Sequence, residues 1–173
     1  MSENLVDIHN EKLSFFTPAG EVKALNDVSL YVRPGEVLGI VGESGSGKSV
    51  TAYSLMGLTA HPGRLVGGDI CFNGHPINKM SEKEMRRIRG NEVSIIFQDP
   101  MTSLNPVYTI GNQIREVILL HTKRTKKQAN ERACELLRLV GINEPEKRMK
   151  QYPHELSGGM RQRVMIAIAL ACE

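Results

Sequence analysis

The chain has 173 residues, of which 40% are hydrophobic and 24% are charged, and this length fits one domain. Its 22 basic and 19 acidic residues leave a net charge of +3, which is not the charge of a nucleic-acid-binding domain. Cys71, Cys134 and Cys172 form no C-x-x-C pair, so neither a zinc site nor a disulfide framework is indicated. Residues 1–10 are polar and the longest apolar run, 164–172, is about half of what a bilayer requires. We therefore expect no signal peptide and no membrane span.

Strand and turn patterns fill the first part of the chain. Three short apolar runs predict strands: Leu5–Ile8, Val28–Val32 and Ile70–Phe72. Residues 16–20 and the Asn73-Gly74 pair predict turns. Residues 37–41, Val-Leu-Gly-Ile-Val, are apolar and rich in β-branched side chains, and they predict a buried strand.

Residues 42–49 read Gly-Glu-Ser-Gly-Ser-Gly-Lys-Ser, which is the phosphate-binding pattern G-x-x-x-x-G-K-S. The pattern stands between the expected strand and an expected helix over Val50–Leu58, which is the context it requires. Glycines let the backbone N–H groups turn inward, and the positive end of the helix dipole attracts an anion. We expect Lys48 to contact the β- and γ-phosphates and Ser49 to bind Mg²⁺. The residues expected around the phosphates are Gly42, Ser44, Gly45, Ser46, Gly47, Lys48, Ser49 and Val50.

The loop has three alternative interpretations. A glycine-rich turn of an unrelated α/β protein is one alternative. A dinucleotide-binding loop fits less well, because reading G-x-G-x-x-G from Gly45 places Val50 at the third glycine position. A guanine-specific GTPase is also a poor fit, since the chain contains no N-K-x-D motif.

Helical patterns dominate from about residue 100 onwards. Ser81 and Glu84 form a capping-box pattern for a short helix that ends near Gly90. Residues 110–120 predict a second helix, and Thr125 with Gln128 opens a third that stops at Gly141. One face of this third helix carries an apolar stripe that we expect in the core: Ala129, Ala133, Leu136, Leu137 and Val140. The basic run 123–127 is read as a solvated loop and helix start, with contact to lipid phosphates as the alternative.

A second candidate anion site lies at Ser157-Gly158-Gly159, between Leu156 and Met160. An apolar helical stretch follows, so the two glycines would leave N–H groups free at a helix start. The alternative is that Ser157 serves only as the N-cap of that helix.

Together these motifs resemble the ATP-binding subunits of ABC transporters. Residues 42–49 match the Walker A motif, 156–160 the family signature with Met160 where Gln is commonest, and 95–100 the Q-loop. The longer strings 97–106 and 152–163 resemble the bacterial dipeptide, oligopeptide and nickel importers in particular. The resemblance covers essentially the whole chain.

The resemblance implies an α/β fold with a P-loop NTPase (RecA-like) core, an N-terminal antiparallel β-subdomain and a helical subdomain, incomplete at the C-terminus. In this reading residues 1–99 hold the β-subdomain and P-loop core, 100–156 the helical subdomain and 157–173 the signature helix. The implied function is an ATP hydrolase that couples ATP and Mg²⁺ to uptake of peptides or related solutes.

The resemblance also implies partners and residue roles. Two such subunits dimerise head to tail, so that Ser157, Gly158 and Gly159 contact the γ-phosphate bound by the partner. Gln98 follows an expected strand over Val93–Phe97 and lies near Mg²⁺ and the attacking water. Phe15 stacks on adenine, with Phe16 as the alternate and core packing as the alternative role of both. Transmembrane permease subunits hold the ATPase peripherally at the cytoplasmic face of the inner membrane, and a solute-binding protein acts indirectly.

Several family features are missing from residues 1–173. Walker B with its Asp and catalytic Glu, the D-loop and the switch histidine would follow the signature helix, and Glu173 is not the catalytic Glu. We therefore expect a fragment that hydrolyses ATP poorly alone. The alternative functions are a soluble ABC ATPase of DNA repair or translation, which the importer-like strings disfavour, and an inactive nucleotide-binding fragment.

Overall fold

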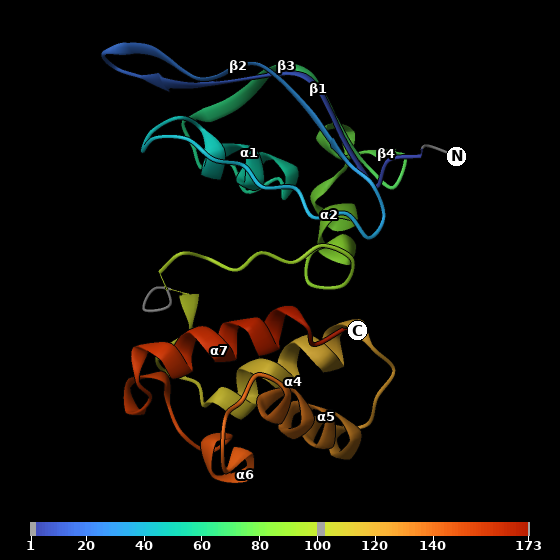
Figure 1. The fold of residues 1–173 in the computed structure, drawn as a ribbon, viewed down its shortest axis with the longest axis vertical. Coiled ribbons are helices and arrows are strands. Elements are labelled where there is room, and N and C mark those ends of the chain that lie inside the picture. The colour runs from blue at the N-terminus through green and yellow to red at the C-terminus, as the bar shows by residue number, and fades with distance from the viewer. Residues whose placement is uncertain (1–2, 100–102, 173) are drawn as a thin grey trace. The chain divides into compact units, whose positions relative to one another are not determined.

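The computed structural model describes residues 3–99 and 103–172 and divides the chain into two compact units, 1–85 and 86–173 (Figure 1). Residues 100–102 of the expected Q-loop string and Glu173 lie outside the described residues. Each unit has a hydrophobic core of its own, and α2 (Glu82–Ile88) crosses the division between them.

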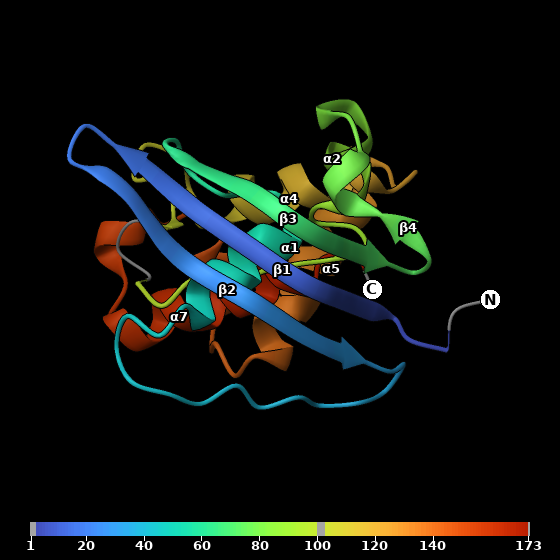
Figure 2. The same ribbon diagram turned by 90° about the horizontal axis from the view of Figure 1, so that it is seen from above.

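The first unit is an antiparallel sheet with one helix against it. Its four strands follow the order β2-β1-β3-β4. Figure 2 shows α1 lying against one face of this sheet. The elements are β1 (Val6–Thr17), β2 (Gly20–Val32), α1 (Lys48–Leu55), β3 (Gly63–Phe72), β4 (His75–Pro76) and the short 3-10 helix η1 (Ile77–Lys79).

The three predicted strands are confirmed, and each is longer than its apolar run. Both predicted turns are confirmed, because β1 and β2 join at residues 18–19 and Asn73-Gly74 joins β3 to β4. The helix expected over Val50–Leu58 starts earlier, at Lys48, and ends at Leu55. The strands are longer than the apolar runs because polar residues also form hydrogen bonds with the neighbouring strand, and the hydrophobic pattern of the sequence does not predict this pairing.

A β-bulge changes which side chains of β1 face the core. Asn10, at φ 49°, and Glu11 together oppose the single residue Gly68 of β3. The extra residue shifts the alternation, so that Ile8 and Leu13 are buried and Glu11 is buried with them. Gly68 is required here because a Cβ at this position would lie 2.5 Å from the Asn10 carbonyl oxygen.

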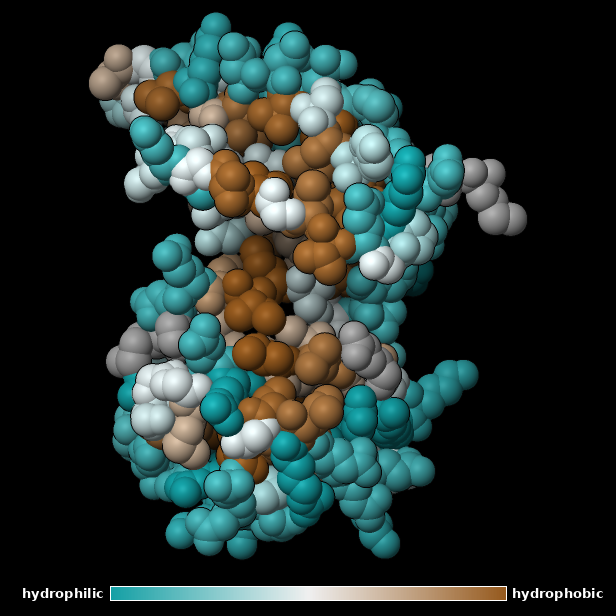
Figure 3. Space-filling model, in the orientation of Figure 1, coloured by the Kyte–Doolittle hydropathy of each residue, from teal (hydrophilic) through white to brown (hydrophobic). Residues whose placement is uncertain are grey.

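Two predicted strands do not form in the structure, so these predictions are wrong. Residues 37–41 form no strand, and Val37 and Val41 are 96% and 94% exposed. Residues 93–97 are irregular apart from one isolated bridge between Arg89 and Val93. A strand needs a neighbour that satisfies its backbone groups, and no described residue forms such a ladder with 37–41. Hydrophobic side chains consequently lie on the surface of each unit (Figure 3).

The second unit is helical. Ile110, Ile114 and Ile118 project from one face of α4 and are fully buried, together with Leu136 and Leu137 of α5. This confirms the apolar stripe predicted for α5. The elements are α4 (Ile110–His121), α5 (Lys126–Leu139), α6 (Pro145–Arg148), the 3-10 helix η2 (Pro153–Glu155) and α7 (Gly158–Ala169).

None of the helices formed by residues 3–99 and 103–172 combines the length and the apolarity needed to span a membrane.

The predicted capping box of α5 is confirmed. The Thr125 hydroxyl accepts the Gln128 N–H at 3.3 Å, and the Gln128 side-chain oxygen accepts the Thr125 N–H at 2.8 Å.

We expect Thr125→Ala to lower the free energy of unfolding of the second unit by about 1 kcal/mol, because it leaves helix N–H groups unpaired. Urea unfolding followed by circular dichroism measures the loss. Thr125→Ser keeps the acceptor and should be nearly neutral, so an equal loss in both variants would contradict the capping role.

Candidate nucleotide-binding site

The loop of residues 42–47 is an exposed turn that leads directly into α1. Gly45 and Gly47 have φ of 83° and 92°, which side chains other than glycine rarely adopt. At Gly47 the space is also taken, because a Cβ there would lie 2.6 Å from the Leu25 Cδ2 atom. The second glycine of the motif is therefore fixed by conformation and by packing against β2.

Lys48 is the first residue of α1, and its side chain folds back over the loop. Its Nζ donates to the carbonyl oxygens of Gly42 at 2.8 Å and Glu43 at 2.6 Å, and to the Ser46 hydroxyl at 3.2 Å. These acceptors use all three donors of the ammonium group. The loop thus holds a positive charge where its backbone and the N-terminus of α1 converge, which is an arrangement that suits a polyphosphate.

The remaining predicted loop residues lie beside this charge. Ser49 is in the first turn of α1 and exposed, next to Lys48, while Ser44 is in the exposed turn and Val50 is half-buried. Mg²⁺ bound through substrate phosphates needs few protein ligands, and one hydroxyl at this place fits that mode. Among residues 3–99 and 103–172 there is no cluster of His, Cys, Asp or Glu that would hold a metal ion without phosphate.

The two candidate aromatic residues lie on opposite faces of β1. Leu13 pairs directly with Leu25, the residue that meets Gly47, so Phe15, two residues along, shares that face. Phe15 is half-buried, and its ring occupies the space that a side chain at Gly63 would need. Phe16 is 42% exposed on the other face, with the Arg64 guanidinium carbon 5.7 Å from the ring centre. Only Phe15 is on the side of the sheet where the loop meets β2.

Gln98 is exposed, at a bend of the irregular segment after Phe97. It belongs to the second unit, whereas Lys48 and Ser49 belong to the first. The sequence analysis predicts that Ser49 and Gln98 bind one Mg²⁺ while Lys48 contacts the phosphates, and this grouping stays a prediction.

The second predicted anion site is a helix N-terminus. Ser157 is the N-cap of α7, and its hydroxyl oxygen accepts the Met160 N–H at 3.3 Å. Gly158 and Gly159 are exposed, and a Cβ at either would meet no atom within 4 Å. The N-cap reading is confirmed, and it leaves the Ser157 O–H able to donate. The open turn and the leading N–H groups of α7 remain accessible to an anion.

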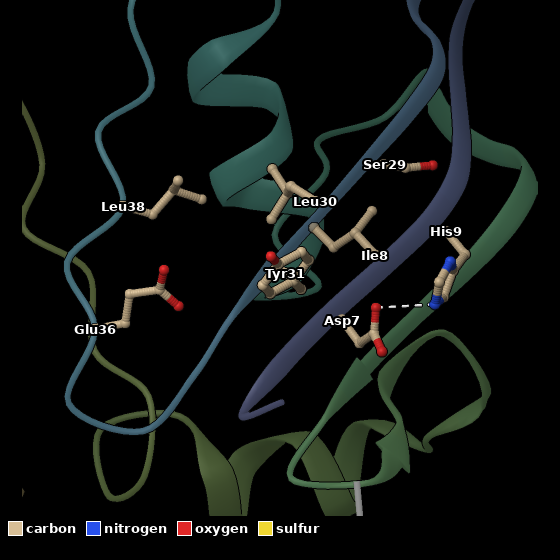
Figure 4. A pocket seen from close by; sticks show the side chains of 8 residues that line it. All are labelled: Asp7, Ile8, His9, Ser29, Leu30, Tyr31, Glu36 and Leu38. Carbon is tan, nitrogen blue, oxygen red and sulfur yellow. Dashed lines mark ion pairs between the residues drawn. The ribbon is translucent and has the colours of Figure 1, made fainter. Parts of the chain in front are cut away.

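A separate hollow of about 460 Å³ lies on the first unit and contains none of the predicted site residues. Figure 4 shows its polar wall, where His9 Nε2 and Asp7 Oδ1 are 2.9 Å apart, and Leu38 from the unpaired segment opposite. Leu38 lies in the segment 37–41, for which no described residue provides a strand partner.

A family model described as "ABC transporter" matches residues 25–173 of the chain. The oligopeptide transport ATP-binding protein OppD of Salmonella typhimurium is 52% identical over 168 residues, which are 97% of this chain and 50% of that protein. Bacillus subtilis OppD is 54% identical, covering 96% of this chain and 47% of the relative. The Escherichia coli dipeptide protein DppD is 49% identical, covering 97% and 51%. The chain therefore spans about half the length of these relatives.

Solved structures agree with these relatives. The ATP-binding cassette MJ0796, in a dimeric post-hydrolysis state with ADP and Pi, has a TM-score of 0.86 and 27% identity. The match covers 96% of this chain and 69% of that one. A second dimeric structure of MJ0796, described as a bacterial ABC transporter cassette, gives a TM-score of 0.85 at 26% identity.

Proposed function

Because this chain belongs to the ABC transporter family, we propose that it is the ATP-binding part of an importer that takes up peptides or related solutes. The observation that carries the proposal is the Lys48 ammonium held over a glycine loop at the start of α1. The names of the relatives OppD and DppD support peptides as the substrate class. The domain division 1–99, 100–156 and 157–173 remains part of the proposal.

In this proposal the phosphates of ATP are bound by hydrogen-bond donors of the glycine loop and the start of α1. Backbone N–H groups of residues 45–49 bind the phosphates of ATP, and Lys48 exchanges its carbonyl acceptors for β- and γ-phosphate oxygens. Ser49 and Gln98 would hold Mg²⁺, which would neutralise part of the phosphate charge. Gln98 also orients the attacking water, and Phe15 provides the adenine platform, since it shares a sheet face with the loop.

The Ser157 turn serves the nucleotide of a partner subunit. Ser157, Gly158 and Gly159 present a hydroxyl and two N–H groups in open space. The two MJ0796 cassettes are described as dimeric, which supports the pairing of two subunits. In the proposed head-to-tail pair these groups contact the partner's γ-phosphate. Such a site responds to ATP and not to ADP, because the contact exists only when the γ-phosphate is present.

The wider assembly follows from the same proposal. Permease subunits hold the ATPase peripherally at the cytoplasmic face of the membrane, and a solute-binding protein delivers the peptide. The whole-protein activity of ATP hydrolysis coupled to uptake is proposed for the assembly, and nucleic acid has no role in it.

A nucleotide titration tests the proposal. Saturable binding of a fluorescent ATP analogue with Mg²⁺ is expected, and Lys48→Met should weaken it about tenfold to a hundredfold, since charge-assisted bonds to phosphate are lost. Lys83→Met, which removes a charge from an exposed position of α2, is the matched control and should bind as the wild type does. Equal affinity in wild type and Lys48→Met would contradict the proposal.

A further inference from the structure

The apolar face of α7 packs against the core of the second unit. Val164 and Ala167 are fully buried, and Met160 and Ile168 are partly buried against the same core. This helical spacing decides which face of α7 is buried. Apolar contact is non-directional, however, so a directional bond on the exposed side can restrict the small rotations that change the aim of the Ser157 turn.

Arg163 makes a directional contact from the exposed side of α7. Its Nη1 donates to the Gly141 carbonyl oxygen at 2.8 Å and to the Val140 carbonyl oxygen at 3.3 Å. These carbonyls stand at the C-terminal end of α5, where helix carbonyls lack internal partners and a positive charge is favoured. One side chain thus ties α7 to the end of a helix whose other face belongs to the core.

Gly141 is shaped to receive this side chain. Its φ of 74° ends α5, and a Cβ at this position would lie 2.6 Å from Arg163 Nη1. A residue with a side chain would therefore force the guanidinium to shift, in addition to straining the turn. The glycine at position 141 thus both ends α5 and leaves room for the Arg163 side chain to bind the carbonyls there.

We propose that Arg163 is a positioning residue that fixes the rotation of α7, and through it the aim of the Ser157-Gly158-Gly159 turn. Its hydrogen bonds go to the main-chain carbonyls of Val140 and Gly141, so it acts on the turn through α7. Its effect on nucleotide-dependent association depends on the function proposed above, whereas its effect on the local order of the turn does not.

Hydrogen exchange tests the local effect in the wild-type chain and in Arg163→Met. The Met160 and Arg161 amides, which bond to Ser157, should exchange about tenfold faster in the variant, because a hydrogen bond from a charged group is lost. Core amides of α4 should be unchanged. Arg163→Lys keeps the charge and should recover part of the protection. Gln162→Met, at the neighbouring exposed position, is the control and should resemble the wild type.

A second measurement separates the two proposals. With ATP and Mg²⁺, sedimentation should show self-association that Arg163→Met weakens about tenfold while ATP affinity at the Lys48 loop is unchanged. Failure of the wild type to bind ATP overturns the proposed function, and the exchange data still decide the role of Arg163. Wild-type exchange at Met160 and Arg161 in Arg163→Met overturns the positioning role. Faster exchange throughout α4, α5 and α7 overturns it as well, because Arg163 would then be a general stabiliser.

Discussion

Replacing Glu11 with leucine should raise the free energy of unfolding of the first unit by about 2–3 kcal/mol, against the usual direction of core substitutions. Glu11 is fully buried, and the nearby Ser54 hydroxyl donates to the Thr51 carbonyl oxygen at 2.8 Å, so neither carboxylate oxygen accepts a well-directed hydrogen bond from a described residue. A buried polar group without a partner opposes folding, and leucine of similar size removes that penalty. Native-state hydrogen exchange of the β1 and β3 amides measures the gain within this unit.

The same carboxyl should make the first unit less stable as pH rises. Burial raises the pKa of the Glu11 carboxyl, and the Ser54 hydroxyl beside it opposes that shift by a smaller amount. Above the unfolded pKa of about 4.3, the unfolded chain releases the proton while the folded chain retains it. Unfolding therefore becomes progressively more favourable until the pH passes the folded pKa, and beyond this point the loss is complete.

Two variants distinguish charge from polarity at this position. Glu11→Gln should abolish this pH dependence but keep most of the penalty, since an unpartnered amide remains buried, whereas Glu11→Leu should remove both. Glu21→Leu, on the exposed end of β2, serves as the control and should change stability by less than about 0.5 kcal/mol. A Glu11→Leu protein less stable than the wild type would show that the carboxyl is satisfied in solution.

Gly47→Ala should abolish nucleotide binding, with a loss of more than about a hundredfold, and should destabilise α1 against the sheet by about 2–4 kcal/mol. Alanine would have to adopt φ 92°, and its Cβ would stand 2.6 Å from Leu25 Cδ2 and 3.0 Å from the Ala24 carbonyl oxygen. Relieving both contacts moves the start of α1, and Lys48 with it. ATP titration and hydrogen exchange of the α1 amides measure the two effects.

Alanine substitutions at two other glycines distinguish the effect of backbone strain from the effect of a steric clash. Gly45→Ala, at φ 83° with no atom near the added Cβ, should cost only about 1–2 kcal/mol. Gly74→Ala, at φ 77° in the turn before β4, carries the same kind of strain away from the loop and should leave ATP affinity intact. If Gly47→Ala bound ATP as tightly as the wild type, the packing of the loop against β2 would have no role in binding.

Features set by neighbouring residues could be predicted from the sequence. The capping box at Thr125, the stop at Gly141 and the N-cap at Ser157 depend on a few positions each, and all three are confirmed. Features set by distant partners could not. Residues 37–41 have every local property of a strand, yet they form none without a neighbouring strand.

The roles of Glu11 and Arg163 also could not be predicted from the sequence pattern. Burial of Glu11 follows from the bulge at Asn10, which reverses the alternation that a sequence reading assumes. Arg163 bonds to two main-chain carbonyls 22 and 23 residues earlier, and such acceptors have no signature in side-chain type. The candidate phosphate loop was predictable because its function depends on contiguous residues.

The folded-back position of Lys48 has a consequence for kinetics. Its ammonium is already bonded to two loop carbonyls and to Ser46 before any ligand arrives, so those bonds have to open as the phosphates enter. Association then has two steps, a diffusional encounter followed by an exchange of lysine partners. At high nucleotide concentration the observed rate should level off at the rate of that exchange. The loop's own carbonyls would thus limit how quickly ATP is taken up, while contributing little to how tightly it is finally held.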